Sequence, residues 1–205
     1  MLAQRIEPPA RRDGNVLQRR LAPITLVVHI NGWPGTGKLT IARCLARRLG
    51  GRLLDNHTLL NPAEALFNRR NPKWQELRSS IRALVLDFAA QLPATEPLIL
   101  TDALANFDYD RRLFDDCRVL AERRSARLVA AILSCDHAEN ERRLVSAGRR
   151  ELHKLTDVEV LADLRSRYTL LRPAGIDLIE IDVTALTDEE AALVLETRAK
   201  EQLGG

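Results

Sequence analysis

The sequence predicts an α/β fold in which a five-stranded parallel sheet carries helices on both of its faces. Short runs of β-branched and aliphatic residues alternate along the chain with longer segments whose apolar residues recur at helical spacing. The first run leads through a glycine-rich turn into such a helical segment. Two of the runs end in aspartate, which places carboxylates at the edge where open parallel sheets bind their ligands.

The composition of the 205-residue chain is that of one ordinary folded domain. No apolar run approaches the roughly 18 residues that a membrane span requires, so we expect no membrane association. The net charge is only +3, and the arginines are scattered among acids without interleaved aromatic residues, which argues against nucleic acid as a partner. Cys44, Cys117 and Cys135 form no C-x-x-C pair, so we expect reduced cysteines in a cytoplasmic protein.

Residues 1–22 carry two prolines, several arginines and little periodicity. We expect them to form a disordered or loosely attached tail, and we place the folded domain at residues 23–205. Glu7 and Asp13 argue against a transit peptide, because such peptides are poor in acidic residues.

The first strand is expected at residues 24–30, and the segment after it reads GWPGTGK, the pattern G-x-x-x-x-G-K. Glycines allow successive N–H groups to point at one anion, and the helix that begins near Lys38 adds the positive end of its dipole. The Lys38 ammonium can reach the β- and γ-phosphates of a nucleotide. The segment is therefore predicted to bind a nucleoside triphosphate through Gly32, Pro34, Gly35, Thr36, Gly37, Lys38, Leu39 and Thr40.

The residue after the lysine departs from this pattern. A Ser or Thr hydroxyl normally ligates Mg²⁺ there, whereas this chain has Leu39 and carries a hydroxyl one position later, at Thr40. One residue is a rotation of about 100° on a helix, so Thr40 cannot simply replace the missing ligand. Either a carboxylate and water hold the metal, or Thr40 contacts another phosphate and the metal site is weaker.

A second strand, expected at residues 52–55, delivers three polar residues to the same edge of the sheet. Asp55 is a candidate to accept a proton from a substrate hydroxyl or to help hold Mg²⁺, and Asn56 and His57 are candidates to orient the substrate. The same residue types also favour a turn and a helix N-cap, so this structural role for Asp55 and Asn56 stays open.

Residues 61–92 are expected to form one or two helices, because Asn61-Pro62 and Asn71-Pro72 each place an N-cap residue before a proline at the first helical position. Arg78 and Arg82 are four residues apart, share a face and are candidates to bind the acceptor; a solvated surface role is the alternative. The predicted core face of this segment consists of Leu77, Ile81, Leu84, Val85 and Phe88.

A third, strongly apolar strand at residues 97–101 is followed directly by Asp102. An aspartate in this place, beside a phosphate-binding loop, binds Mg²⁺ directly or through water. Because Leu39 offers no hydroxyl, Asp102 and Asp55 are the predicted anchors for the metal.

A helix is expected at residues 106–124, a fourth strand at 127–135, and a further helix that ends near Gly148. Arginines then crowd residues 142–156, which we interpret as a mobile basic lid that closes over the triphosphate. Arg143 and Arg149 are candidates to stabilise charge on the transferring phosphoryl group.

The last elements are a helix at residues 157–171, a fifth strand at 177–183 and a closing helix at 184–201. Thr187 and Glu190 have the spacing of a capping box. Val183 and Thr184 precede this helix at the binding edge of the sheet and are candidates to contact a purine base.

Together these segments resemble the small P-loop kinases of the shikimate, gluconate, adenylate and cytidylate kinase group. The resemblance covers residues 24–200 and depends on GWPGTGKLT, LLDNH, LILTD, ENERRLVSAGRR and IEIDVTALTDEE; GKLTIA, DNH and HKLTD resemble more narrowly a group of bacterial kinase-like P-loop ATPases. It implies a three-layer P-loop NTPase fold, ATP and Mg²⁺ as cofactors, an acceptor-facing Asp55 and an arginine near Arg143 beside the adenine. The acceptor motifs D-G-[FY]-P-R and D-x-D of the named kinases are absent.

Three functions remain open from the sequence. The leading hypothesis is a kinase that phosphorylates a small metabolite, nucleoside or nucleotide, acting as a monomer or homodimer. An antibiotic- or toxin-type phosphotransferase would use the same residues. A nucleotide-binding regulatory protein with little or no turnover belongs to a different class, and Leu39 is the feature that favours it.

Overall fold

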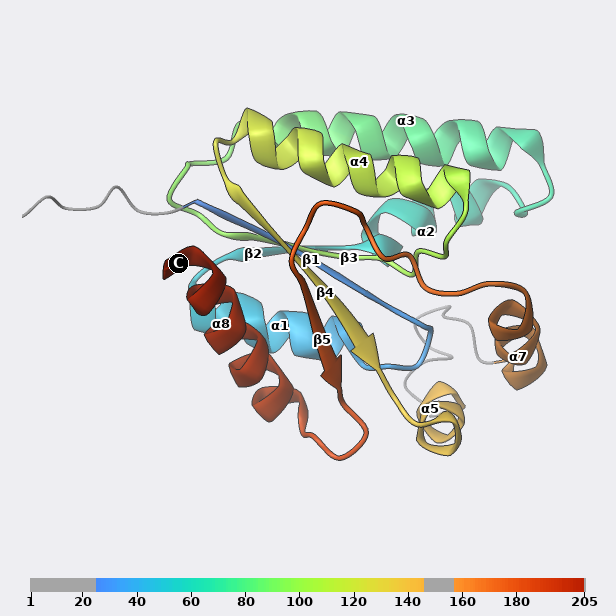
Figure 1. Ribbon diagram of the computed structural model, residues 1–205. Helices are drawn as coiled ribbons and strands as arrows, with labels where there is room; N and C mark the ends of the chain where they lie inside the picture. Colours follow the sequence, from blue (N-terminus) through green and yellow to red (C-terminus); the bar gives the residue numbers. More distant parts are fainter. Residues whose placement is uncertain (1–24, 146–156, 205) are drawn as a thin grey trace, which may run out of the picture.

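The computed structural model describes residues 25–145 and 157–204, which form a central sheet between two layers of helices (Figure 1). All five strands are parallel, and their order across the sheet is β2-β3-β1-β4-β5. This confirms the predicted fold class. The strands are β1 (Leu26–Gly32), β2 (Arg52–Asp55), β3 (Leu98–Thr101), β4 (Arg127–Ser134) and β5 (Leu178–Asp182).

Helices α1 (Lys38–Leu49) and α8 (Asp188–Gly204) cover one face of the sheet, and α3 (Pro72–Ala89) and α4 (Asp108–Arg123) cover the other (Figure 1). Helix α2 (Asn56–Leu66) follows β2 without a connecting loop. Helices α5 (His137–Leu144) and α7 (Val158–Arg167) lie beyond the carboxyl ends of the strands, on the right of Figure 1.

Successive side chains of β1 point to opposite faces of the sheet, and each face has its own hydrophobic core. Val28 and Ile30 pack toward α1 and α8, whereas Val27 packs toward α3 and α4. All three side chains are fully buried, as expected for a central parallel strand with helices on both faces. His29 points to the same side as Val27, and its ring meets that of Phe114 edge to face at 5.1 Å between centroids.

The strand order locates a crevice beside β1. The connection after β1 leads to β2 at one edge of the sheet, while the connection after β3 crosses to β4 on the far side of β1. Open α/β sheets bind ligands outside the carboxyl ends of the strands where such connections diverge. The residues that follow β1 and β3 therefore face the same crevice.

Two predicted helix caps are confirmed and one helix start is wrong. Asn71 caps α3, and Thr187 and Glu190 form the predicted capping box before α8. Helix α2, however, begins at Asn56 instead of Asn61, because the Asp55 side chain accepts a hydrogen bond from the His57 N–H over 3.0 Å. Pro62 consequently lies inside this helix.

The predicted core face of α3 is confirmed only in part, since Leu77, Ile81 and Val85 are half-buried but the other two residues are not. Leu84 and Phe88 are 59% and 63% exposed, whereas Arg82 is only 3% exposed. Leu86 and Ala89 form the buried side, together with Trp74 near the start of the helix. The orientation of α3 places Arg82 against Asp102 and Asp116 inside the molecule.

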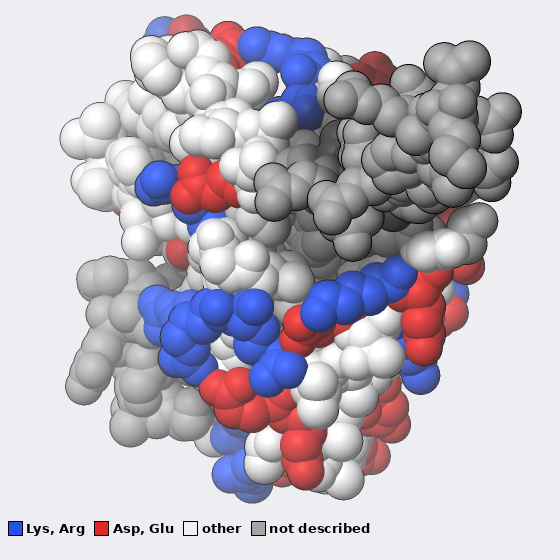
Figure 2. Space-filling view, turned by 90° about the vertical axis from the view of Figure 1, so that its left-hand side faces the viewer, with Lys and Arg blue, Asp and Glu red and all other residues white. Residues whose placement is uncertain are grey.

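The surface at the other end of the molecule, opposite α5 and α7, carries charges of both signs. Figure 2 shows Lys and Arg side chains beside Asp and Glu side chains over the lower half of that face. Within residues 25–145 and 157–204, no helix combines the length and the apolar character that crossing a membrane requires. The predicted tail, residues 1–22, and most of the predicted lid, residues 146–156, lie outside the described residues.

Candidate active site

A cleft of about 1000 Å³ opens at the carboxyl edge of the sheet, in the crevice beside β1. Its walls come from the glycine-rich loop and α1, from the β2–α2 junction, from α3 and from the segment after β3. The side chains of α5 and α7 and the segment that leads into α8 complete it. The cleft thus joins the predicted phosphate loop to the polar residues after β2, to Arg78 and to Asp102.

The glycine-rich loop wraps around the Lys38 ammonium. Its Nζ donates hydrogen bonds to the carbonyl oxygens of Gly32 and Trp33 over 2.6 and 2.9 Å. Gly35 and Gly37 have φ angles of +95° and +86°, which residues with side chains rarely adopt. The loop therefore has the backbone form that turns N–H groups inward, with α1 starting directly behind it.

Asn140 on α5 holds this loop from outside the cleft. It is fully buried, and its Nδ2 donates a hydrogen bond to the carbonyl oxygen of Pro34 over 3.0 Å. Arg165 on α7 donates in turn to the Asn140 Oδ1. A Cβ atom at Gly35 would overlap the Asn140 amide, so glycine is required there for two reasons. No motif in the sequence marks Asn140 as a residue of the site.

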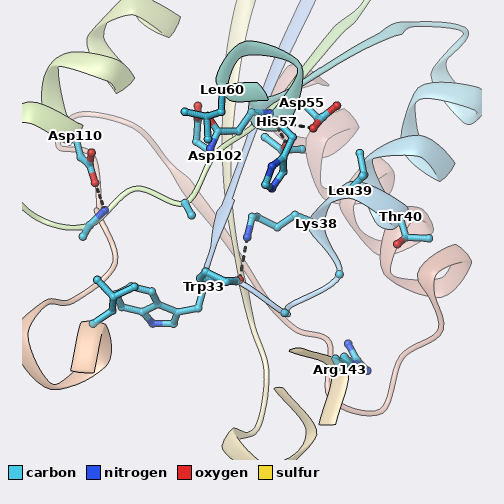
Figure 3. A pocket seen from close by; sticks show the side chains of 18 of the residues that line it. Trp33, Lys38, Leu39, Thr40, Asp55, His57, Leu60, Asp102, Asp110 and Arg143 are labelled. Carbon is cyan, nitrogen blue, oxygen red and sulfur yellow. Dashed lines mark hydrogen bonds between the residues drawn. The ribbon is translucent and has the colours of Figure 1, made fainter. Parts of the chain in front are cut away.

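The three predicted residues after β2 all line the cleft. Asp55 accepts hydrogen bonds through both oxygens, from the His57 N–H over 3.0 Å and from the Thr58 hydroxyl over 2.8 Å. Its carboxylate is therefore the N-cap of α2 and part of the cleft wall at once. Figure 3 shows Asp55, His57 and Lys38 around the same part of the cleft.

Asp102 reaches the cleft from a buried position with 1% exposure. Its Oδ2 lies 3.1 Å from Nε2 of His29, and its Oδ1 lies 3.6 Å from Nη1 of Arg82. Burial acts to raise the pKa of Asp102, but the Arg82 charge and the His29 hydrogen bond outweigh it and hold the pKa below the ordinary range. The Oδ1 oxygen of this ionised carboxylate is thus paired with the Arg82 charge but accepts no hydrogen bond from the described residues.

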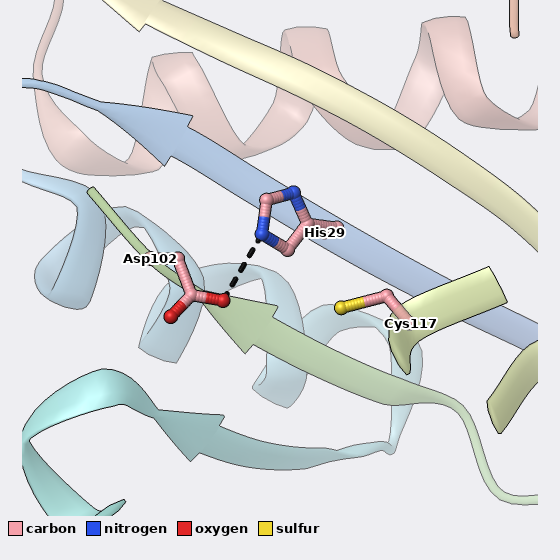
Figure 4. Close-up of side chains that lie close together, drawn as sticks. All are labelled: His29, Asp102 and Cys117. Carbon is pink, nitrogen blue, oxygen red and sulfur yellow. Dashed lines mark hydrogen bonds and ion pairs between the residues drawn. The ribbon is translucent and has the colours of Figure 1, made fainter. Parts of the chain in front are cut away.

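His29, Asp102 and Cys117 place potential metal-ligating atoms within 4.8 Å of one another (Figure 4). Two features oppose a metal ion there. The guanidinium of Arg82 contacts both Asp102 and Cys117 and already supplies a positive charge. Burial raises the pKa of the Cys117 thiol to about 12, so the thiol stays protonated at neutral pH. We interpret this cluster as a structural charge network.

The two predicted acceptor arginines lie in different places. Arg82 is absent from the cleft wall and donates instead to Asp116 Oδ2 over 3.1 Å and to the Leu113 carbonyl over 2.8 Å. Its predicted role in direct substrate binding is therefore wrong, because its donors are used inside the protein. Arg78 does line the cleft, and it lies between the rings of Trp74 and Tyr109.

Arg143 lines the opposite end of the cleft. Its Nε donates to Glu139 over 2.6 Å, and its Nη2 donates to the carbonyl oxygens of Val183 and Thr184 over 3.1 and 3.2 Å. Val183 is fully buried, and neither Val183 nor Thr184 belongs to the cleft wall; that a purine base rests at this loop stays a prediction. Leu186, Thr187 and Asp188 line the cleft instead, while Arg149 lies outside the described residues.

The structure adds residues that the sequence did not single out. Phe107 and Tyr168 line the cleft with their ring centroids 5.5 Å apart, although they are 61 positions apart in the chain. Asp110 lines it as well; burial raises its pKa, and its Oδ2 accepts a hydrogen bond from the Ala105 N–H over 2.6 Å. Trp33 was visible as a bulky residue within the glycine pattern, but no sequence signal marked the others.

Comparison with protein families gives one match: the model described as AAA domain matches residues 27–171. These residues run from β1 through α7 and so include the glycine-rich loop, Asp55 and Asp102. No curated protein matches the chain by sequence.

Solved structures share the fold at low sequence identity. A protein from Chloroflexus aurantiacus proposed to be a kinase is 19% identical, with a TM-score of 0.63 over 88% of this chain and 98% of its own. A sugar kinase from Janibacter is 22% identical, with a TM-score of 0.59 over 86% and 95%. The Mycobacterium tuberculosis APS kinase, solved with AMPPNP and APS, is 18% identical, with a TM-score of 0.56 over 87% and 99%.

Proposed function

The chain belongs to the AAA domain family, and from this premise and the content of the cleft we propose that it is an ATP-dependent phosphotransferase with a small-molecule acceptor. One observation carries the proposal. A single cleft of about 1000 Å³ contains the Lys38 loop at one wall and a separate group of polar and aromatic side chains at the other. Space and chemistry for two ligands side by side are what group transfer requires.

The nucleotide would bind with its phosphates in the glycine-rich loop. Inward N–H groups, the start of α1 and the Lys38 ammonium offset its negative charge. Lys38 would exchange its present carbonyl partners, Gly32 and Trp33, for phosphate oxygens. Arg143 and Leu186 line the end of the cleft next to Gly37 and are proposed to contact the base.

Asp102, which lines the cleft, is proposed as the residue that would hold a magnesium ion, through water where the Arg82 guanidinium faces its Oδ1. Its Oδ1 is buried without a hydrogen bond from the described residues and belongs to a carboxylate that stays ionised. Carboxylate oxygen is the kind of ligand that Mg²⁺ prefers. Bound there, the ion would offset the negative charge of the triphosphate. Leu39 contributes no ligand, so water would complete the coordination.

Asp55 is proposed as the group that receives the proton of an acceptor hydroxyl. The hydroxyl oxygen forms a bond to the γ-phosphorus, the bond from phosphorus to the β–γ bridging oxygen breaks, and ADP leaves with that electron pair. The proton passes to the Asp55 carboxylate. The hydrogen bonds from His57 and Thr58 hold this carboxylate in place.

A nucleotide-binding regulatory protein is the second candidate. Leu39 favours it, because loss of the usual hydroxyl ligand weakens magnesium binding and hence turnover. A phosphotransferase that acts on an antibiotic or toxin is a variant of the leading proposal and would use the same residues.

The test is to incubate the pure protein with Mg·ATP and a pooled panel of nucleosides, nucleotides, sugar acids, shikimate and aminoglycosides. Mass spectrometry then detects any compound that has gained one phosphoryl group. The proposal predicts such a product, and it predicts that Lys38→Ala abolishes both ATP binding and transfer.

Two further variants separate binding from chemistry. Asp55→Asn should bind ATP normally and lose transfer by at least about 100-fold, the usual contribution of a general base. Asp108→Asn, an exposed residue at the start of α4, is the matched control and should change neither. Tight ATP binding without any product from the panel would favour the regulatory protein.

A further inference from the structure

Two aromatic rings lie at helix ends in the wall of the cleft. Phe107 occupies the N-cap position of α4 and Tyr168 the C-cap position of α7, and their ring centroids are 5.5 Å apart. Both residues line the cleft, and 39% and 37% of their surfaces stay exposed. Phe107 has no side-chain oxygen with which to cap α4, so the stability of this helix does not explain a phenyl ring there.

Backbone hydrogen bonds between two distant segments hold these rings in place. The segment after β3 and the segment after α7 run antiparallel to each other, and the Asn106 N–H donates to the Thr169 carbonyl oxygen over 2.8 Å. Phe107 directly follows Asn106, and Tyr168 directly precedes Thr169. The paired segments therefore fix the backbone that carries both rings.

The side chain of Asn31, near the end of β1, joins these segments to the phosphate loop. It is 3% exposed, and its Nδ2 donates to the carbonyl oxygens of Leu104 and Leu171 over 3.0 and 3.4 Å. Its Oδ1 accepts from the N–H groups of Leu104 and Gly32 over 2.8 and 2.9 Å. One buried amide thus holds the start of the loop and both ring-bearing segments in a fixed relative position.

A third ring comes from the phosphate loop itself. Trp33 is half-buried and lines the cleft, and Figure 3 shows its indole directed away from Arg143, the residue proposed to contact the base. Within residues 25–145 and 157–204, the indole forms no hydrogen bond and no ring contact. We call Trp33, Phe107 and Tyr168 the aromatic wall. Its members carry no charge and offer a ligand mainly flat apolar surface.

We propose that the aromatic wall binds a flat aromatic or heteroaromatic ring on the acceptor molecule. A ring of the ligand would cover apolar surface that the cleft now leaves in water, in the offset or edge-to-face contacts that rings prefer. This inference rests on the proposed phosphotransferase function and narrows its acceptor to a hydroxyl compound that carries such a ring. An open-chain polyol would present a hydroxyl to Asp55 but leave the three rings exposed to water.

The test measures binding separately from transfer. The protein is first saturated with Mg·AMPPNP, so that no probe can occupy the nucleotide site. Calorimetry then compares pairs of hydroxyl compounds that differ by a ring: cytidine with methyl β-D-ribofuranoside, phenyl with methyl β-D-glucopyranoside, and L-phenylalaninol with L-alaninol. Saturation-transfer NMR identifies which protons of each compound contact the protein.

We expect at least one ring compound to bind at least about ten-fold more tightly than its partner, with its ring protons closest to the protein. The double variant Phe107→Leu, Tyr168→Leu keeps apolar side chains but removes two flat faces, and it should abolish that difference while Mg·AMPPNP still binds normally. Tyr168→Phe keeps the ring and should preserve the difference.

Phe88→Leu on α3 is the matched control, because Phe88 is 63% exposed and does not line the cleft. Three results would overturn the inference: equal binding within every pair, a ring preference that survives in the double variant, or no binding by any ring compound. If the double variant does not fold, as judged by its melting transition, Tyr168→Leu alone decides. Failure of the proposed function looks different, because it gives binding that depends on the aromatic wall without phosphoryl transfer from Mg·ATP.

Discussion

The side-chain amide of Asn140 donates a hydrogen bond to the carbonyl oxygen of Pro34 over 3.0 Å, and this bond joins α5 to the phosphate-binding loop. Arg165 on α7 donates to the other end of the same amide. Two helices on either side of the arginine-rich segment at residues 146–156 therefore meet at the back of the loop that is proposed to bind ATP. The position of α5 and the shape of this loop depend on each other.

Replacing Asn140 by alanine should weaken ATP binding about ten-fold. The variant leaves the Pro34 carbonyl without its donor and the Arg165 guanidinium without its acceptor, and an unsatisfied buried group costs about 1–3 kcal/mol. Calorimetric titration with ATP measures the effect. Asn106→Ala serves as control, because Asn106 is exposed and its side chain pairs, among the described residues, only with Arg111 on the surface. An unchanged ATP affinity in Asn140→Ala would show that the loop keeps its shape alone.

Substitutions at Arg82 and Asp102 can separate an effect on folding stability from an effect on phosphoryl transfer. Asp102→Asn leaves the buried Arg82 charge with only the half-exposed Asp116, among the described residues, as an acidic partner, so the free energy of unfolding should fall by up to about 3 kcal/mol in urea denaturation. The double variant Arg82→Met, Asp102→Leu removes both charges and should recover much of that loss. If Asp102 also anchors Mg²⁺, the double variant stays inactive although it is stable.

Recovery of phosphoryl transfer in that double variant would contradict the metal role of Asp102. The neighbouring Asp116 supplies the matched control. It pairs with Arg82 from a side chain that is 47% exposed, so Asp116→Asn should cost far less stability than Asp102→Asn.

The folded protein should lose stability in acid through Asp102. Its pKa in the folded state lies below the ordinary range, so the unfolded chain binds more protons as the pH falls. The stabilisation is complete above the pKa of the unfolded chain, about 4, and is lost as the pH falls through the lower pKa of the folded state. Urea unfolding between about pH 6 and pH 3 should therefore give a steeper decline for the native protein than for Asp102→Asn.

Asp110 should change the acid dependence of stability in the opposite direction. Burial raises its pKa, so its ionised form destabilises the fold, and its contribution improves as the pH falls through the folded pKa toward the unfolded value. Asp110→Asn should accordingly make the acid decline steeper. The same slope in Asp102→Asn and in the native protein would exclude the Arg82–Asp102 pair as the cause.

Leu39→Thr should strengthen magnesium binding. It restores a hydroxyl directly after Lys38, where a phosphate-binding loop normally provides a metal ligand. We expect the Mg²⁺ concentration for half-maximal ATP binding or transfer to fall about ten-fold, which corresponds to about 1.4 kcal/mol. Arg47→Lys is the control and should leave that concentration unchanged, because Arg47 is exposed on the same helix and does not line the cleft. A Leu39→Thr protein with the native magnesium dependence would mean that this residue is not what limits the metal site.

Much of the fold follows from short stretches of sequence, because the interactions involved are local. The five strands, the phosphate loop and the caps at Asn71 and Thr187 each depend on residues within a few positions of one another. Asp55 is a residue whose role local sequence could not decide. An aspartate suits both a helix N-cap and a binding site, and only the structure shows that the same Asp55 carboxylate caps α2 and lines the cleft.

The sequence by itself determined that this protein carries a glycine-rich loop of the pattern G-x-x-x-x-G-K on a parallel sheet, with aspartates at the same edge. Tertiary structure alone decided that Arg78 faces the cleft while Arg82 is buried, and that Asn140 holds a loop 106 positions earlier in the chain. Hydrophobic periodicity could not distinguish the two arginines, since they share one face of α3. The partners of Arg82 come from β3 and α4, and contacts between distant segments leave no local pattern in a single sequence.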